Sequence, residues 1–332
     1  FATMVDSGLS ISRSVAVLAT QTQNKYFAKI LHEVHDDVES GISLSAALGK
    51  HPKLFDDLYV AMVAAGEVGG SIDLVLQSVA SNLEKQVELH RKVKGAMTYP
   101  VIVVSVIAVI VTVMMVVIVP IFKRLFASLG GKLPLPTRVM IGISDTLASW
   151  RVGLVILFLI IAVLLFRRWI KTNKGRRTWD SFKMRPPVFG PVVQKAGLSR
   201  FSSTLSSLLS AGVPAMEALD ITADAVGNSI LADAVREVKA RVREGSSFAV
   251  PMSKLPVFPP LAVQMVEVGE QTGALDDMLK RLSDFYVGEV DQTVDNLTSI
   301  LEPFLVVSMG VVIGAIIISL YLPMFDYIKL IH

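Results

Sequence analysis

The chain has 332 residues, of which 52% are hydrophobic and 18% are charged, and its formal net charge at pH 7 is +3. Soluble domains carry about 25% charged residues, so this composition favours a membrane protein over a soluble globular one. The sequence has no cysteine, which excludes disulfides, thiolate catalysis and zinc–thiolate sites. The chain begins at Phe1 inside an expected helix and without a signal peptide, so we expect an N-terminal region to be missing.

The N-terminal part shows helical periodicity. In 24–39 and in 71–89, apolar residues return every three or four positions, which predicts two amphipathic helices. The second stretch has no Gly or Pro before Gly95, so we expect it to continue into the apolar segment that follows. Glycines and prolines mark turns between further helical stretches, which predicts a small bundle of about six helices.

Three segments are apolar and free of charge: 101–119, 152–166 and 304–322. A helix of about 20 apolar residues crosses the roughly 30 Å of a bilayer core, so the first and third predict transmembrane helices. The second is shorter, but Trp150 and Trp169 flank it as tryptophans do at membrane interfaces. We therefore expect a third span, with a buried core helix as the alternative.

The basic residues predict an orientation. They are dense in 167–185 and 85–94, sparser in 120–149, and reduced to Lys329 in the tail. Because cytoplasmic flanks are enriched in Lys and Arg, we expect the two large blocks in the cytoplasm and the loop and C-terminus in the periplasm. The stretch 167–185 is expected to act as this positive anchor or to bind lipid phosphates; its sparse aromatic residues argue against nucleic acid.

The two large blocks repeat each other in sequence, with one residue lost. The matched pairs include glycines, prolines and acidic residues: Gly8 and Gly212, Gly41 and Gly245, Pro52 and Pro256, Glu67 and Glu270, Gly70 and Gly273, Asp73 and Asp276, Pro100 and Pro303, and Pro120 and Pro323. If both blocks lie on one side and each precedes a span, the chain must return once through the membrane. The unmatched segment 152–166 would supply that return.

Two of the histidines are candidates for a metal site. His32 and His35, with Asp36 beside them, have a spacing that would hold a metal on a helix face. Their repeat partners are Arg236 and Lys239, which favours a solvated polar face. No phosphate-binding glycine loop and no Ser–His–Asp context occur, so we expect no metal, no cofactor and no enzyme activity.

Two GE-x-x-G turns, at 66–70 and 269–273, are candidates for a site. Their glycines would permit a tight turn between helices, and the carboxylate would then lie near the N-terminus of the next helix. The alternative is a contact surface for another subunit. The candidate residues are Gly66, Glu67, Gly70, Asp73, Gly269, Glu270, Gly273 and Asp276.

The spans carry a second group of candidates. Their lack of charge argues against a transporter or channel. Glu302 is the one acid at a span edge, and is expected to be an interfacial carboxylate or a contact for a cationic group on a membrane-embedded partner. Gly310 and Gly314 form a GxxxG pair that permits close packing with the protein's own helices, another subunit or a partner helix. The edge residues are Tyr99, Pro100, Glu302 and Pro303.

Several motifs are similar to those of a known family. They are SLLSAGVPAMEAL at 207–219, GEVGGSID at 66–73, GEQTGALDDML at 269–279 and LEPF at 301–304. These motifs resemble the signatures of the platform protein family of type IV pili and type II secretion, the PilC/GspF family. The resemblance covers essentially the whole chain, including LPLPT at 133–137. Two further motifs, KGAMTYP at 94–100 and YLPMF at 321–325, are more similar to the pilus branch.

The resemblance implies a non-enzymatic inner-membrane platform protein that couples a hexameric cytoplasmic ATPase to pilin insertion or removal at the fibre base. It implies as partners that ATPase, pilin or pilin-like subunits, other inner-membrane pilus components, membrane lipids and further copies of the chain. The alternative function is the type II secretion platform protein, and a small transporter or channel is more remote. Under mechanical coupling, charge reversal at Glu67 and Glu270 should abolish piliation without lowering membrane abundance, whereas lost abundance would indicate a folding role.

The sequence thus predicts an all-α, polytopic membrane protein with three transmembrane helices and two homologous cytoplasmic helical-bundle domains. The expected parts are a first cytoplasmic repeat at 1–97, a span at 98–122, a periplasmic loop at 123–149, a span at 150–169, a basic cytoplasmic connector at 170–200, a second repeat at 201–300, a span at 301–323 and a periplasmic tail at 324–332.

Overall fold

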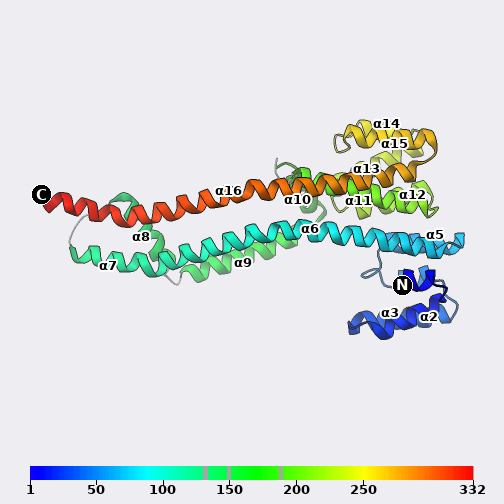
Figure 1. Cartoon of the computed structure of the whole chain (residues 1–332), viewed down its shortest axis with the longest axis horizontal. Coiled ribbons are helices and arrows are strands. Elements are labelled where there is room, and N and C mark those ends of the chain that lie inside the picture. Colours follow the sequence, from blue (N-terminus) through cyan, green and yellow to red (C-terminus); the bar gives the residue numbers. More distant parts are fainter. Residues whose placement is uncertain (130–133, 148–150, 187–189, 332) are drawn as a thin grey trace. The chain divides into compact units, whose positions relative to one another are not determined.

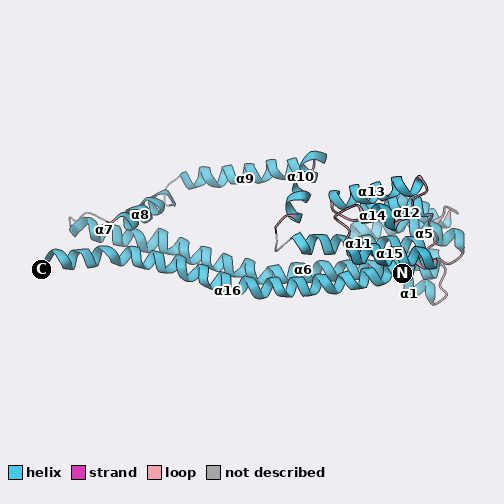
Figure 2. Ribbon diagram, turned by 90° about the horizontal axis from the view of Figure 1, so that it is seen from above, coloured by secondary structure: helices cyan, strands magenta, loops and turns pink. Residues whose placement is uncertain are grey.

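The computed structural model describes residues 1–129, 134–147, 151–186 and 190–331, and all regular elements in these ranges are helical (Figures 1 and 2). The all-α prediction is therefore confirmed. Trp150 and Leu133, the first residue of LPLPT, lie outside the described residues. The elements are α1 (Ala2–Asp6), α2 (Ile11–Gln21), α3 (Lys25–Glu39), α4 (Leu44–Gly49), α5 (Asp57–Gly69), α6 (Ile72–Val113), the π-helical segment η1 (Met114–Ile118), α7 (Val119–Leu129), α8 (Leu135–Leu147), α9 (Arg151–Ile170), α10 (Asn173–Met184), α11 (Gly190–Ser210), α12 (Ala215–Ala225), α13 (Ser229–Arg243), α14 (Ala249–Ser253), α15 (Pro260–Thr272) and α16 (Leu275–Ile331).

The chain divides into two compact units. The first, here the bundle unit, consists of Phe1–Arg91 and Arg177–Thr293. The second, here the apolar unit, consists of Lys92–Arg176 and Val294–His332. The helices α6 and α16 contribute residues to both units.

The two blocks of the bundle unit have the same local backbone features. Asn24 Oδ1 accepts two backbone N–H groups of α3 at 3.0 and 3.1 Å, and its repeat partner Asn228 accepts two of α13 at 2.9 and 3.3 Å. Such side-chain caps satisfy donors that a helix start leaves open. Positive φ angles also recur in pairs, for example 92° at Gly41 and 95° at Gly245.

The two blocks share a hydrophobic core. Adjacent residues of α5 point to different sides of that helix, and both are fully buried: Val63 lies in the core of the first block, while Met62 joins the core of the second. Val75 and Val79 of α6 also lie in the second core. Each such side chain contributes on the order of 1.5–3 kcal/mol by its removal from water. The blocks, expected as two domains, thus pack into one unit.

The interval 170–200, expected to be a basic connector, is largely helical. It forms α10 and the first half of α11, and α11 packs into the second core through Leu198 and Phe201. The physical reason is its composition: beyond Arg185 only Lys195 and Arg200 are basic, and the residues there supply apolar side chains such as Val192, which is buried.

The apolar unit holds the long hydrophobic segments. Two helices, Ile72–Leu125 and Leu275–Pro323, are long and apolar enough to cross a membrane. The third expected segment, 152–166, lies in α9, and its described side chains include Phe158, which is 70% exposed. This exposure differs from that of a buried core helix, the alternative considered for the segment.

The interval 123–149, expected to be a loop, contains the end of α7 and all of α8. Its α8 packs against η1 and α16 through Met140 and Ile141, which share a small core with Met115 and Ile316. The interval was expected to be a loop because it lies between two expected spans, but the face of its helix that packs here combines Met140 and Ile141 with the buried residues Thr137 and Ser144.

Candidate functional site

Each GE-x-x-G turn ends one helix and begins a long one. Gly70 ends α5 with φ 68°, and Gly273 ends α15 with φ 71°, a left-handed conformation that glycine adopts at little cost. The following residue closes the turn by donating its N–H to Gly66 O at 3.0 Å or to Gly269 O at 2.9 Å. The chain therefore reverses within a few residues and enters α6 or α16.

The first glycine of each turn lies where two helices approach closely. A Cβ atom on Gly66 would lie 2.9 Å from Val75 Cγ2, and one on Gly269 would lie 2.9 Å from the backbone Cα of Leu275. Both glycines are buried. The small residue is thus required by the packing of α5 on α6 and of α15 on α16.

The glutamate of each turn caps a different helix from the one expected. Glu67 Oε1 accepts the backbone N–H of Leu44 at 2.5 Å, and Oε2 accepts that of Ser45 at 3.3 Å together with the Ser45 hydroxyl. Leu44 and Ser45 begin the short helix α4, which precedes α5. We expected the carboxylate at the start of the next helix, and the structure corrects this.

The second block repeats the arrangement. Glu270 accepts the backbone N–H of Phe248 at 2.9 Å and that of Ala249 at 3.4 Å, at the start of α14. A carboxylate bound by N–H groups at a helix start satisfies open donors and opposes the positive end of the helix dipole. Both glutamates are half-buried. This geometry favours the structural turn over the partner contact for Glu67 and Glu270.

The acids in the first turn of the following helices are Asp73 and Asp276. Asp276 Oδ2 accepts the hydroxyl of Ser210 at 3.2 Å, and its backbone carbonyl accepts the hydroxyl of Ser206 at 2.8 Å. The dipole position that we expected for the glutamates is therefore occupied by these aspartates.

A polar contact joins the two blocks, and sequence reasoning missed it. Asn82 of α6 is 5% exposed; its Oδ1 accepts the Ser203 hydroxyl at 3.0 Å, and its Nδ2 donates to the Ser207 hydroxyl at 3.3 Å. Beside it, Lys85 pairs with Asp284 of α16 at 2.6 Å. The sequence feature that could have predicted this contact is the serine-rich run of α11, because small polar side chains permit two helices to lie close together.

Three titratable groups of the bundle unit, Tyr59, Tyr286 and Asp180, have shifted pKa values. Burial raises the pKa of Tyr59 to about 12, and burial together with Glu289 raises the pKa of Tyr286 to about 12, so both phenols stay neutral. Burial alone would raise the pKa of Asp180, but hydrogen bonds from Lys183 and Ser229 hold that pKa below its ordinary value. Asp180 thereby ties α10 to the start of α13.

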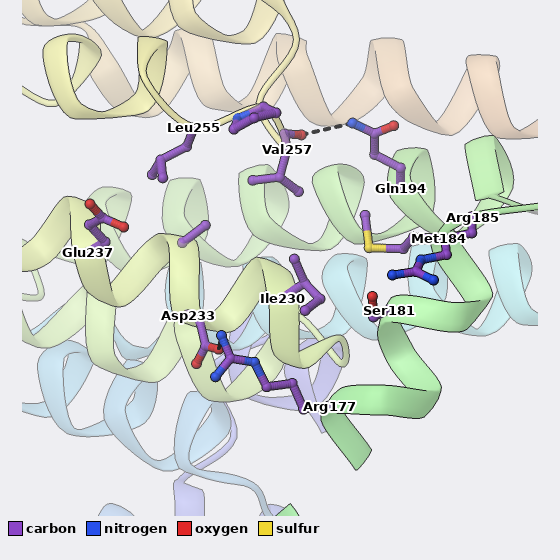
Figure 3. Close-up of a pocket in the computed structure, with 12 residues that line it drawn as sticks. Arg177, Ser181, Met184, Arg185, Gln194, Ile230, Asp233, Glu237, Leu255 and Val257 are labelled. Atoms are coloured by element: carbon purple, nitrogen blue, oxygen red, sulfur yellow. Dashed lines mark hydrogen bonds and ion pairs between the residues drawn. The ribbon is translucent and has the colours of Figure 1, made fainter. Parts of the chain in front are cut away.

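A cavity of about 500 Å³ lies between α10, α11, α13 and the segment before α15 (Figure 3). Arg177 and Asp233 form an ion pair of 3.4 Å at its rim, and Gln194 Nε2 donates to the carbonyl of Val257 at 3.0 Å. Its lining includes no histidine. Within the described ranges, no group of His, Asp and Glu has a geometry that would hold a metal ion.

The span-edge candidates lie in the apolar unit. Tyr99 and Glu302 are exposed, as is Pro303, whereas Pro100 is buried. The glycine pair is open: a Cβ atom on Gly310 or Gly314 would meet no atom within 4 Å. In the described part of the chain, no helix therefore packs on this pair. Tyr99 and Glu302 occupy matched positions of the repeat. One side chain is a phenol and the other a carboxylic acid, but both are exposed.

The chain matches known proteins along nearly its whole length. A family model described as "Type II secretion system (T2SS), protein F" matches residues 1–120 and 201–323. The chain is 41% identical over 327 residues to "Type IV pilus assembly protein PilC" of Myxococcus xanthus, covering 98% of this chain and 78% of the relative. It is 43% identical over 329 residues to the protein of that name from Thermus thermophilus, covering 98% and 80%.

The sequence identity to relatives named for type II secretion is lower than the identity to these two pilus assembly proteins. "Type II secretion system protein F" of Aeromonas hydrophila is 33% identical over 325 residues, covering 98% of this chain and 84% of the relative. The two matched segments of the family model coincide with the two blocks and the apolar segments that follow them. The chain belongs to the type II secretion system protein F family, which includes relatives named type IV pilus assembly protein PilC.

Proposed function

We propose that this chain is the inner-membrane platform protein of a type IV pilus machine, which couples a cytoplasmic ATPase to pilin insertion or removal at the fibre base. The observation that carries the proposal is the similarity at 41% and 43% identity, over nearly the full chain, to proteins named for type IV pilus assembly. The proposed role is mechanical and non-enzymatic.

The long helices support mechanical coupling. Both α6 and α16 begin at a GE-x-x-G turn in the bundle unit and continue without a break into an apolar stretch. A continuous helix transmits a displacement of one end to its other end. We propose that the bundle unit receives the motion of a hexameric ATPase and that these helices carry it to pilin or pilin-like subunits in the membrane.

The proposed topology has three spans. The blocks face the cytoplasm, α9 returns the chain through the membrane, and the C-terminus faces the periplasm. The basic residues of 167–185 support this orientation. Other inner-membrane pilus components, membrane lipids and further copies of the chain complete the proposed set of partners. The open pair Gly310 and Gly314 is available to one of these helices.

The alternative function is the platform of a type II secretion system. The supporting observation is the 33% identity to a protein named for that system. Deletion of the gene for this chain separates the two, with complementation by the intact chain as the control. Loss of surface pili and twitching with normal exoprotein release supports the pilus role, whereas loss of exoprotein release with normal pili supports secretion.

A direct test of coupling is site-specific cross-linking in intact membranes. A photoreactive residue replaces Val68, which is 92% exposed at the end of α5. Adducts with the ATPase support the proposal, and the matched probe at Val306 in the apolar stretch of α16, which is 53% exposed, should give none with it.

A further inference from the structure

Two prolines at matched positions of the repeat interrupt the helices of the apolar unit. Pro323 lies inside α16, and Pro120 is the second residue of α7, after the π-helical segment. Proline has no N–H, so each one leaves a carbonyl oxygen of its own helix without the usual donor. In an apolar environment such a carbonyl must find another partner.

The carbonyl that Pro323 leaves open is that of Ser319, four residues earlier. Thr137 of α8 donates its hydroxyl to this oxygen, with 2.5 Å between Oγ1 and O. Thr137 is 1% exposed, so water does not compete for the carbonyl at this place. The hydroxyl thus replaces the N–H that the proline lacks.

The carbonyl that Pro120 leaves open follows from the π-helical hydrogen bonds. Val119 donates its N–H to Met114 O, five residues back. The next bond of that series would run from Pro120 to Met115 O, but Pro120 has no N–H. Ser144 of α8 donates its hydroxyl to Met115 O instead, at 2.5 Å, and is 1% exposed.

The two donors lie on one face of α8. Thr137 and Ser144 are seven positions apart, about two helical turns, and Met140 and Ile141 between them form the apolar part of the same face. At the far end of α8, Asp145 pairs with Lys123 of α7 at 2.7 Å. The helix therefore contacts α16 through one hydroxyl and η1 through the other.

We propose that α8 is a clamp that joins the two proline-interrupted helices, with the hydroxyls of Thr137 and Ser144 bound to the carbonyls that Pro323 and Pro120 leave open. The clamp fixes the axial position of α16 against η1 and α7. A shift of one residue along α16 moves Ser319 O by about 1.5 Å, which is enough to break the bond from Thr137. The two interrupted helices consequently move together.

Disulfide formation between α7 and α16 tests the clamp. The rings of Phe122 and Tyr321 lie 6.5 Å apart, and the chain has no cysteine of its own, so Phe122→Cys with Tyr321→Cys reports on this contact alone. In membranes under limiting oxidant, Thr137→Val should lower the disulfide yield on the order of fivefold, the effect of one hydrogen bond. Thr137→Ser keeps the hydroxyl and should keep the yield.

The matched control is Thr146→Val on the same helix. The hydroxyl of Thr146 is exposed and bonds only Gly142 O of α8 at 2.8 Å, so this change should leave the yield unaltered. Pro323→Ala restores an N–H donor to Ser319 O, so the loss of the Thr137 hydroxyl no longer leaves that carbonyl unsatisfied, and Thr137→Val should have a smaller effect in that background. Ser144→Ala should show the same dependence on Pro120.

Two results would overturn the clamp. One is a Thr137→Val yield equal to that of Thr146→Val; the other is an equal loss with and without Pro323. If Thr137→Val fails to accumulate, membrane abundance replaces disulfide yield as the readout. Abundance restored by Pro323→Ala supports the clamp, and abundance that stays low in that background contradicts it.

Discussion

Glu67 accepts the backbone N–H of Leu44 at 2.5 Å, although the two residues are 23 positions apart in the chain. The repeat partner Glu270 binds Phe248 in the same way at 2.9 Å. Each GE-x-x-G turn is therefore tied to the start of the short helix that precedes the helix it ends, and its carboxylate is half-buried.

Replacing Glu270 tests whether this contact holds the block together. Glu270→Ala leaves the first N–H groups of α14 without a partner, and should lower the free energy of unfolding by about 1–3 kcal/mol. Glu267→Ala is the matched control, because Glu267 lies one turn earlier on α15 and is exposed. Denaturant unfolding of the full chain in detergent measures both.

Charge reversal at both glutamates distinguishes a folding role from a subunit contact in cells. We expect charge reversal at Glu67 and Glu270 to lower membrane abundance together with piliation, because the carboxylates cap α4 and α14. Normal abundance with lost pili would instead show that these carboxylates touch another subunit. The structure thus favours the folding outcome that the sequence left open.

Alanine at the buried glycine of the second turn should be more harmful than alanine elsewhere on the adjoining helix. Gly269→Ala places a Cβ atom 2.9 Å from the backbone of Leu275, which cannot turn aside, and should cost about 1–3 kcal/mol. Gly288→Ala on α16 meets no atom within 4 Å and should stabilise the helix by up to about 1 kcal/mol. Thermal unfolding compares the two; equal shifts would contradict the close approach.

At the contact between the two blocks, loss of the buried Asn82 side chain should lower the free energy of unfolding more than loss of the Lys85 ion pair. Asn82→Ala removes a buried amide from between two serines and should cost about 1–3 kcal/mol. Lys85→Ala removes a partly exposed ion pair one turn away and should cost about 0–1 kcal/mol. A larger loss for Lys85 than for Asn82 in denaturant unfolding would show that the buried network does not hold the blocks in register.

The contribution of Asp180 to the free energy of unfolding should depend on pH. Its pKa is lower in the folded chain than its ordinary value of 3.8, so the unfolded chain binds the proton more readily. The carboxylate therefore stabilises the fold above pH 3.8, and this contribution is lost as the pH falls through the folded-state pKa. The difference in unfolding free energy between wild type and Asp180→Asn should shrink from pH 6 to below pH 3.8; a constant difference would contradict this.

Much of the fold followed from periodicity alone. The stretch 24–39 predicted a helix, and α3 runs from Lys25 to Glu39. The absence of Gly and Pro before Gly95 predicted a helix that continues, and α6 extends to Val113. These features depend on neighbours in the chain, which a single sequence contains.

Contacts between distant segments did not follow from the sequence. The bond from Leu44 to Glu67 has no local spacing that would reveal it. The apolar run of α5 did contain a usable signal, because a helix that is apolar on more than one side is buried on more than one side. Met62 and Val63 follow this rule, and they show why the two blocks form one unit.

In the proposed topology, both blocks face the cytoplasm beneath one membrane. Single cysteines at the matched exposed positions Val68 and Gln271, and a third at Leu135 of α8, test it with a membrane-impermeant maleimide, because the chain offers no other thiol. We predict labelling of Val68→Cys and Gln271→Cys only after the inner membrane is opened, and of Leu135→Cys in spheroplasts with that membrane intact. Labelling of Val68→Cys and Gln271→Cys from opposite faces would contradict the account.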